Sequence, residues 1–282
     1  MLGDLKRARE LSDQALALSA VDPSCQCEAH HAMGGTLLSA GQLALSKQHF
    51  DASLAAYDEA NPQHSALGSD LGVFAYAWSA HTMWLLGDDQ EAGARAEQAI
   101  ALARRRQHVY SEALAHAYAA LLHQMRLDTP GTLASAETAV LVCDRYGIAY
   151  YGDWARVLIG WAQGVERPAD GIAIIESALE RLDANRAQAR RPYYLSLLAQ
   201  TYERLGSRER AATLVNAAIA MALERGDVWW LPALQLQKAE LETGPSREAA
   251  LRQALATARS QESRALERRI LESPVAATVE LG

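Results

Sequence analysis

The chain has 282 residues, half of them hydrophobic, and a formal net charge of −7. This acidic balance argues against general binding to nucleic acid or to anionic membranes, because both need a basic surface. No apolar run is long enough to cross a bilayer, and the N-terminus lacks the apolar core of a signal peptide. Three cysteines without a spacing framework, Cys25, Cys27 and Cys143, fit a reducing compartment, so we expect a cytoplasmic protein with no membrane partner.

Turn signals separate helix-forming segments along the whole chain and predict a series of antiparallel helix pairs. A lone first helix over residues 4–18 ends before Asp22 and Pro23, and Thr129 with Pro130 suits the N-cap and first turn of a later helix. A last helix and a short tail are expected at the C-terminal end. The pairs are expected at residues 27–40 with 43–57, 70–86 with 90–105, 110–126 with 131–146, 152–163 with 169–185, 192–205 with 208–225, and 229–242 with 247–261, and the last helix at 263–272.

Four glycines, each followed at fixed distances by small residues, mark an internal repeat. After Gly3, Gly41, Gly87 and Gly206, the residues five and twelve positions onward are alanine or serine in every case. Glycine tolerates the positive φ of a tight turn between helices. Small residues on one face of the second helix let the first helix approach closely. Another small residue stands seven positions before three of these glycines, for example Gly34 before Gly41.

A second register supports the same repeat. When residues 74–110 are shifted by 40 positions, Asp88 matches Asp128 and Glu97 matches Glu137. These spacings predict an all-α fold, a tetratricopeptide-like α-solenoid forming a right-handed superhelix of about six antiparallel helix pairs. We assign residues 1–272 to the repeat domain and residues 273–282 to a C-terminal tail.

Several stretches resemble the helical C-terminal region of large bacterial signalling ATPases. They are DLGVFAYAWSAHTMWLLGDDQEA at 70–92, HVYSEALAHAYAALLHQ at 108–124, WARVLIGWA at 154–162, RPYYLSLLAQTYERLGSRERA at 191–211 and WWLPALQLQKAELE at 229–242. In that group a class III adenylate/guanylate cyclase, protein-kinase or LuxR-type DNA-binding domain is joined to a STAND-like ATPase and a tetratricopeptide array. The resemblance implies that this chain is a sensor or interaction arm.

The chain departs from that group because it contains no GxxxxGK[ST] pattern and no cyclase or kinase signature. The resemblance therefore carries over no ATPase or cyclase activity. It implies a protein partner, or an upstream ATPase or cyclase domain, and leaves open whether the chain is part of a longer protein or a free-standing relative.

Aromatic residues gather on or just before the first helices of the later pairs, which line the concave face in this architecture. Tyrosine and tryptophan offer rigid contact area with a polar tip, so they anchor many binding sites. Each ring could instead pack between repeats, but we expect two or more of them to face the groove. The candidate residues for binding a partner or ligand are His81, Trp84, Tyr151, Trp154, Trp161, Tyr194, Trp229 and Trp230.

One cluster, Cys25, Cys27, His30 and His31, contains residue types that bind zinc. It lacks a second half at usable spacing, so a helix start with a buried cysteine and solvated histidines is the favoured interpretation. We expect no metal and no cofactor.

Other polar residues are better explained by structure than by chemistry. His116 and His123 share a helix face, but no neighbouring motif supplies a nucleophile or acid. Asp88 and Asp89 suit a turn with an N-cap, and the arginine run at 104–106 suits a solvated helix end more than a binding patch. No catalytic residue is predicted.

Three functions remain open. The favoured one is a non-catalytic interaction and regulatory module that binds a partner protein or a neighbouring domain in an aromatic groove open to solvent. The alternative is a sensor that binds a small-molecule effector in a closed pocket with convergent polar groups. An all-α enzyme is the least favoured, since no catalytic motif supports it.

Overall fold

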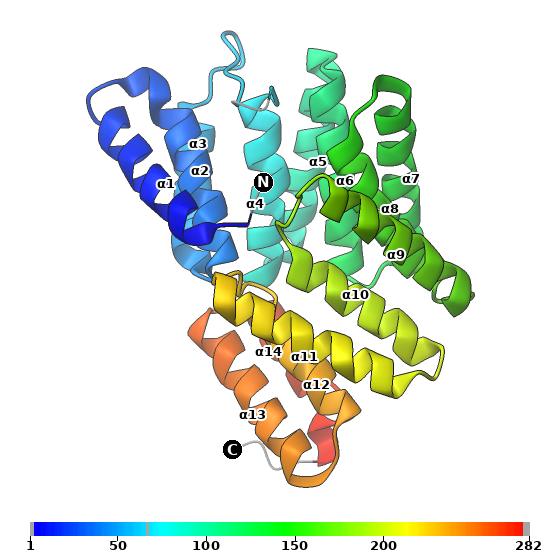
Figure 1. Cartoon of the computed structure of the whole chain (residues 1–282). Coiled ribbons are helices and arrows are strands. Elements are labelled where there is room, and N and C mark those ends of the chain that lie inside the picture. The colour runs from blue at the N-terminus through cyan, green and yellow to red at the C-terminus, as the bar shows by residue number, and fades with distance from the viewer. Residues whose placement is uncertain (1–2, 66–67, 279–282) are drawn as a thin grey trace.

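The computed structural model describes residues 3–65 and 68–278, and within them the regular structure is helical (Figure 1). The only β-type pairing among these residues is an isolated antiparallel bridge between His64 and Asp70. The helices are α1 (Leu5–Ser19), α2 (Gln26–Ser39), α3 (Leu43–Ala56), α4 (Leu71–Leu85), α5 (Asp89–Arg106), α6 (Val109–Met125), α7 (Thr129–Tyr146), α8 (Ala149–Gln163), α9 (Pro168–Ala184), α10 (Arg191–Arg204), α11 (Arg208–Arg225), α12 (Leu231–Leu241), α13 (Gly244–Ser260) and α14 (Arg264–Leu271), with 3-10 turns η1 (Pro23–Cys25) and η2 (Ala276–Thr278).

Six antiparallel pairs, from α2–α3 to α12–α13, follow the lone helix α1. The all-α solenoid expected from the sequence is therefore confirmed, with helix ends within a few residues of those predicted. One helix start was placed wrongly, because Asp128 and not Thr129 caps α7. The Asp128 carboxylate accepts a hydrogen bond of 3.0 Å from the Gly131 amide, which leaves Thr129 as the first helical residue.

The turn glycines and the small residues act as their spacing predicts. Gly41 and Gly87 have φ of 71° and 92°, in the left-handed region that other residues avoid. A Cβ on Gly34 would come within 2.9 Å of the Phe50 ring, so α2 and α3 could not approach as closely. Ser46 also uses the close approach, because its hydroxyl donates to the Gly34 carbonyl at 2.8 Å.

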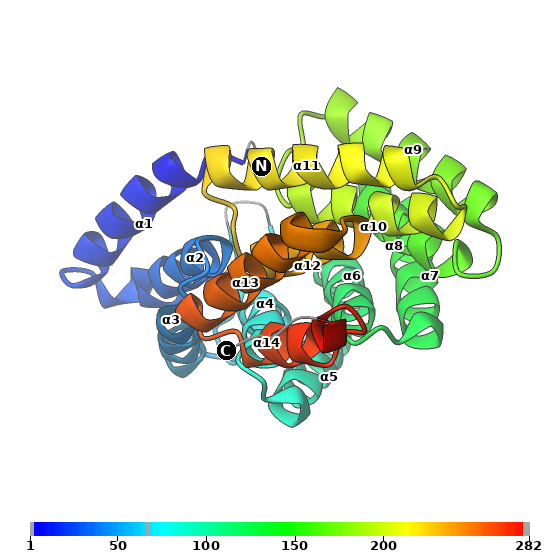
Figure 2. The same cartoon turned by 90° about the horizontal axis from the view of Figure 1, so that it is seen from below.

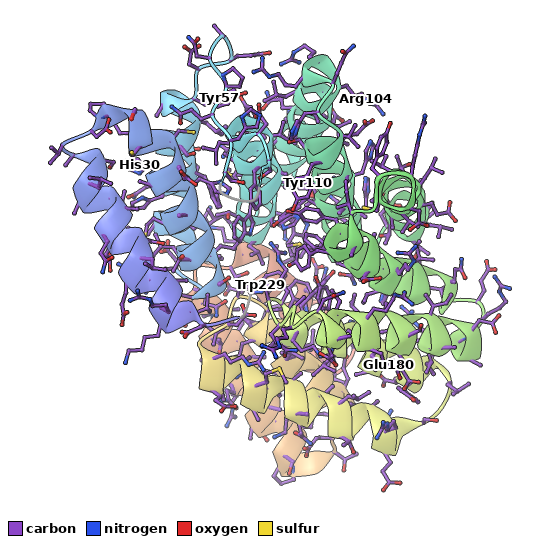
Figure 3. The ribbon with its side chains drawn as sticks, turned by 45° about the horizontal axis from the view of Figure 1, so that its top comes forward. His30, Tyr57, Arg104, Tyr110, Glu180 and Trp229 are labelled. Atoms are coloured by element: carbon purple, nitrogen blue, oxygen red, sulfur yellow. The ribbon has the colours of Figure 1, made fainter. Side chains whose placement is uncertain are left out.

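The last pairs return to the first ones, so the superhelix closes on itself. In Figures 1 and 2, α10 to α14 lie across one end of the array formed by α1 to α9. The Val228 amide donates to the Ser39 carbonyl at 2.8 Å, joining the sixth pair to the first. The Ser263 hydroxyl donates to the Leu85 carbonyl at 3.4 Å, joining α14 to α4. Figure 3 shows Trp229 near the centre of the molecule, where these segments meet.

Candidate functional site

The eight residues predicted to line the groove are all buried, each with at most 7% of its surface exposed. The expectation of an aromatic groove open to solvent is therefore wrong for the described chain. One reason is packing between neighbouring pairs, as between Trp154 and Tyr118, whose ring centroids are 4.7 Å apart. Another is the connection before α10, which places Arg190 over rings of α4 and α8. That these residues bind a partner stays a prediction. They are His81, Trp84, Tyr151, Trp154, Trp161, Tyr194, Trp229 and Trp230.

Arg190 fills the centre of this aromatic interior. It lies in the connection before α10, has a left-handed φ of 60° and is 7% exposed. Its guanidinium approaches His81 Nδ1 at 3.4 Å, and a guanidinium over aromatic faces is attracted by their quadrupoles. Its guanidinium carbon lies 5.1 to 5.7 Å from the ring centroids of Trp78, Tyr118, Trp154 and Trp229.

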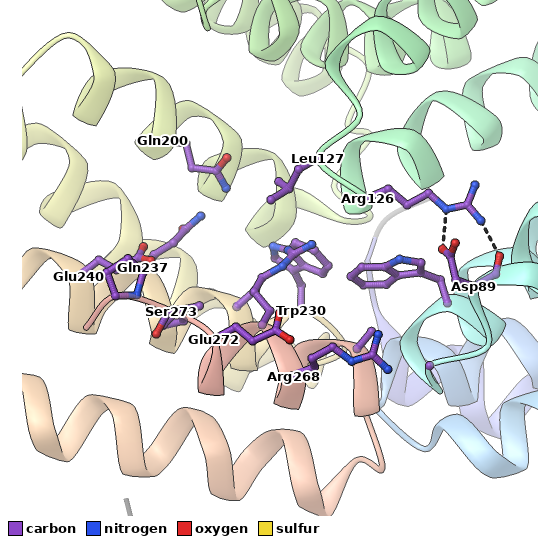
Figure 4. Close-up of a pocket in the computed structure, with 17 residues that line it drawn as sticks. Asp89, Arg126, Leu127, Gln200, Trp230, Gln237, Glu240, Arg268, Glu272 and Ser273 are labelled. Atoms are coloured by element: carbon purple, nitrogen blue, oxygen red, sulfur yellow. Dashed lines mark hydrogen bonds and ion pairs between the residues drawn. The ribbon is translucent and has the colours of Figure 1, made fainter. Parts of the chain in front are cut away.

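A polar pocket of about 730 Å³ remains at the seam between the two halves (Figure 4). Residues from five places meet there: the turns after α4 and α6, the helices α10 and α12, and the segment around α14. Of the eight residues predicted from the sequence, Trp84 and Trp230 line this pocket. The pocket is the best-formed candidate site because its volume and its convergence of polar groups are typical of ligand sites.

One wall of the pocket is aromatic and carries its own cation. The ring centroids of Trp84 and Trp230 are 6.4 Å apart. The guanidinium carbon of Arg269 lies 5.2 Å from the Trp84 centroid and 5.8 Å from the Trp230 centroid. Arg269 also donates to the Met125 carbonyl at the end of α6. Burial lowers the pKa of Arg269 to about 10, so the group stays charged at neutral pH.

Other residues of α10 and α12 add amides and a carboxyl group to the pocket. Gln200 accepts a hydrogen bond of 2.7 Å from the Trp161 indole, which links the pocket to one of the predicted aromatic residues. Gln237 is 7% exposed and its Oε1 has no hydrogen-bond partner within the described chain. Burial, with a smaller contribution from the charge of Glu203, raises the pKa of Glu240 to about 7.

The remaining pocket ions are paired or lie at the rim. Arg126 donates to the Asp89 carboxylate at 2.7 Å and to the Asp89 carbonyl at 2.6 Å. Arg268 and Glu272 are exposed. Gln237, Glu240 and Arg269 could not be predicted as site residues, because no motif distinguishes them from the other polar positions of α12 and α14.

The cluster weighed as a metal site is dispersed in the structure. The Cys27 thiol lies 3.6 Å from the Ser53 hydroxyl, and His30 Nδ1 lies 3.0 Å from His49 Nδ1. His31 is buried between aromatic rings and is not solvated as expected. In residues 3–65 and 68–278, no three histidine, cysteine or acidic side chains are grouped to hold a metal ion.

Most of the other polar residues singled out from the sequence have hydrogen-bond partners, whereas Nε2 of His116 has none within the described chain. Asp88 caps α5 as predicted, accepting from the Glu91 amide at 3.0 Å. His123 is bonded to the Asp128 carboxylate at 2.7 Å, and His116 is buried. The helix end at residues 104–106 was expected to be solvated, and this holds only in part. Arg105 and Arg106 donate hydrogen bonds to Glu59 in the connection between α3 and α4.

Comparison with known proteins shows the fold but not a family. No family model matches the chain. It is 27% identical over 274 residues to an uncharacterized protein of Rhizobium meliloti (strain 1021), a match that covers 94% of this chain and 27% of that protein. The chain thus spans about a quarter of the length of this curated relative.

Three solved structures share the architecture at low identity. The Cut9–Hcn1 heterotetramer of APC/C matches with a TM-score of 0.59 and 13% identity, over 96% of this chain and 47% of that one. Aspartyl phosphate phosphatase F from Bacillus subtilis matches with a TM-score of 0.53 and 13% identity, over 89% of this chain and 65% of that one. A STAND protein with a tetratricopeptide repeat sensor from Pyrococcus horikoshii matches with a TM-score of 0.50 and 12% identity, over 91% of this chain and 42% of that one.

These likenesses establish a tetratricopeptide-like fold and carry no statement about activity. In the described part of the chain, none of the helices combines the length and apolar character of a membrane span.

Proposed function

We propose that the chain is a non-catalytic interaction and regulatory module of a bacterial signalling or transcription-regulatory system. Its partner is a separate protein or a neighbouring domain, such as an upstream STAND-like ATPase or cyclase domain. The shared architecture with a STAND repeat sensor and the much greater length of the Rhizobium relative support this proposal. Repeat arrays of this kind present extended surfaces whose shape depends on how successive units stack.

The position of the pocket is the observation that carries the proposal. Its walls come from the second and third helix pairs, from α10 and α12, and from α14. An occupant therefore contacts both halves of the closed superhelix at once. A ligand shifts an equilibrium only by its differential affinity for two states, and an occupant that contacts both sides of the seam favours the closed arrangement.

The same geometry favours a second candidate function, the sensing of a small molecule. The volume of about 730 Å³ lies within the range of small-molecule sites, and indole, amide and carboxyl groups converge there. A panel of metabolites tested by thermal melting addresses this role directly, because a ligand that binds only the folded state raises the melting temperature. No shift across a broad panel contradicts the sensor role.

The interaction role is tested with the neighbouring domain. We expect the reading frame upstream of Met1 to encode an ATPase segment, and we expect that segment to bind this chain in calorimetry. Reversing the charge of Arg268 at the exposed rim should weaken binding about tenfold, as rim charges steer association. Arg252→Glu on α13, outside the pocket, is the matched control and should change affinity less than twofold. Equal affinities for both variants, or no binding by the wild-type chain, contradict the proposal.

A further inference from the structure

One carboxyl group in the pocket wall has no direct contact with a group of opposite charge, although the charge of Arg269 acts on it. Asp89 is bonded to Arg126 at 2.7 Å. Arg269 is held by the Met125 carbonyl and covers the two indoles. The carboxyl group of Glu240 takes part in no hydrogen bond or ion pair among the described residues, although it lies inside the pocket wall.

Gln237 adds a second free acceptor one helical turn earlier. Residues three apart on a helix lie on the same face, so Gln237 and Glu240 present their side chains side by side on α12. The Gln237 amide nitrogen donates to the Ser196 carbonyl at 3.5 Å, which leaves Oε1 as a buried acceptor without a donor. A buried acceptor without a donor costs free energy, and a ligand with N–H groups recovers it.

The end of α12 reinforces this preference. Glu240 lies in the last turn before Leu241, where the helix dipole is negative and favours a cation. The pKa of Glu240 is raised because burial and the nearby Glu203 disfavour its charged form more than the charge of Arg269 favours it. A bound cation stabilises that charged form.

The rest of the same helix face is apolar. Trp230, Ala233 and Leu236 line the pocket ahead of Gln237 and Glu240. Ten residues of helix correspond to about 15 Å along the axis. An elongated occupant along α12 thus meets an apolar surface first and two acceptors at its far end.

We propose that the pocket binds an organic ammonium ion with an elongated apolar body, whose N–H groups donate to Glu240 and Gln237 while its body lies along Leu236 towards Trp230. The inference rests on the pocket being a ligand site. The ammonium group belongs either to a free amine or to a lysine side chain of a partner.

The test uses the full chain and two probes that differ only in the charged end. We expect 4-phenylbutylamine to bind in calorimetry, and at ten times its Kd to raise the melting temperature by about 2–4 °C. The acid 5-phenylpentanoate should do neither. Nα-acetyllysine methylamide is the probe that represents a lysine side chain of a partner. Tighter binding of this probe points to a partner's lysine, and tighter binding of 4-phenylbutylamine points to a free amine.

Glu240→Gln removes the charge at nearly constant shape and should weaken binding of the amine at least tenfold. Glu242→Gln, at the C-cap of the same helix and outside this pocket, should leave the affinity unchanged. The inference is overturned if the amines do not bind up to about 10 mM, if the acid binds as well as the amine, or if Glu240→Gln binds like the wild type. An acid that binds in place of the amine overturns the assigned charge and leaves the sensor role standing.

Discussion

The guanidinium carbon of Arg190 lies 5.1 Å from the ring centroid of Tyr118, although 72 positions separate the two residues in the chain. The contact joins the connection before α10 to the inner face of α6. Because the same guanidinium also contacts rings on α4 and α8, Arg190 holds the C-terminal half against three earlier repeats. Arg190 is thus one of the contacts that close the superhelix and bury the aromatic residues.

Replacing Arg190 with methionine should destabilise the closed form by about 2–4 kcal/mol. The substitution keeps a long apolar stem but removes the cation–π contacts and the stronger of the two positive charges, those of Arg190 and Arg225, that act on the buried Asp227. Urea titration monitored by circular dichroism measures the loss. Arg186→Met is the matched control, since Arg186 is exposed in the same connection and also has positive φ. If Arg186→Met lowers the free energy of unfolding as much as Arg190→Met does, the effect comes from the loop backbone and not from the Arg190 side chain.

Gly34→Ala should destabilise the chain by about 1–3 kcal/mol, because the added Cβ meets the Phe50 ring at 2.9 Å. The physical reason is close approach of α2 and α3, so Phe50→Leu in the same chain should restore part of the loss. A double-mutant cycle with the two single variants measures this coupling. If the two substitutions change the free energy of unfolding additively, the side chains at positions 34 and 50 are not in steric conflict.

His31 should make the protein less stable in acid. Burial lowers its pKa from 6.5 to about 3 in the folded state, so the neutral ring is the form that folds. As pH falls below 6.5, the unfolded chain takes up a proton that the folded chain does not, and stability declines by about 2 kcal/mol between pH 7.5 and pH 5.

His31→Phe removes this linkage and suits the neighbouring Phe74 ring, whose centroid is 4.3 Å away. As the pH falls from 7.5 to 5, the free energy of unfolding of the variant should therefore rise by about 2 kcal/mol relative to that of the wild type. Denaturant unfolding at the two pH values measures the difference. A constant difference contradicts the assignment of the acid sensitivity to His31.

Arg269→Ala should loosen α14 without unfolding the rest of the chain. An eight-residue helix has little stability of its own, and Arg269 anchors it to the indoles and to α6. Amide hydrogen exchange in residues 264–271 should become at least about tenfold faster, while α6 stays protected. Arg268→Ala, the exposed neighbour, should leave exchange as in the wild type. Unchanged protection of α14 in the Arg269 variant contradicts the anchor.

Part of the candidate site could be predicted from residue type alone. Trp84 and Trp230 were expected in the binding groove, and both line the pocket, while the other six candidates lie in the interior. Sequence could not separate the two groups, because a tryptophan on the inner face of a first helix has the same local pattern whether or not another segment covers it. Gln237 and Glu240 carry meaning only once α12, α14 and the turns of earlier pairs are brought together.

The sequence by itself determined the helices, their pairing and their close approach. Turn glycines such as Gly41 and small residues such as Ser46 act through contacts between neighbours in the chain. The tertiary structure alone decided that the superhelix closes, that Arg190 and Arg269 cover the aromatic rings, and that a pocket remains at the seam. Those contacts join residues up to 178 positions apart. They arise from small rotations between successive pairs that add up over the array, so no local pattern contains them.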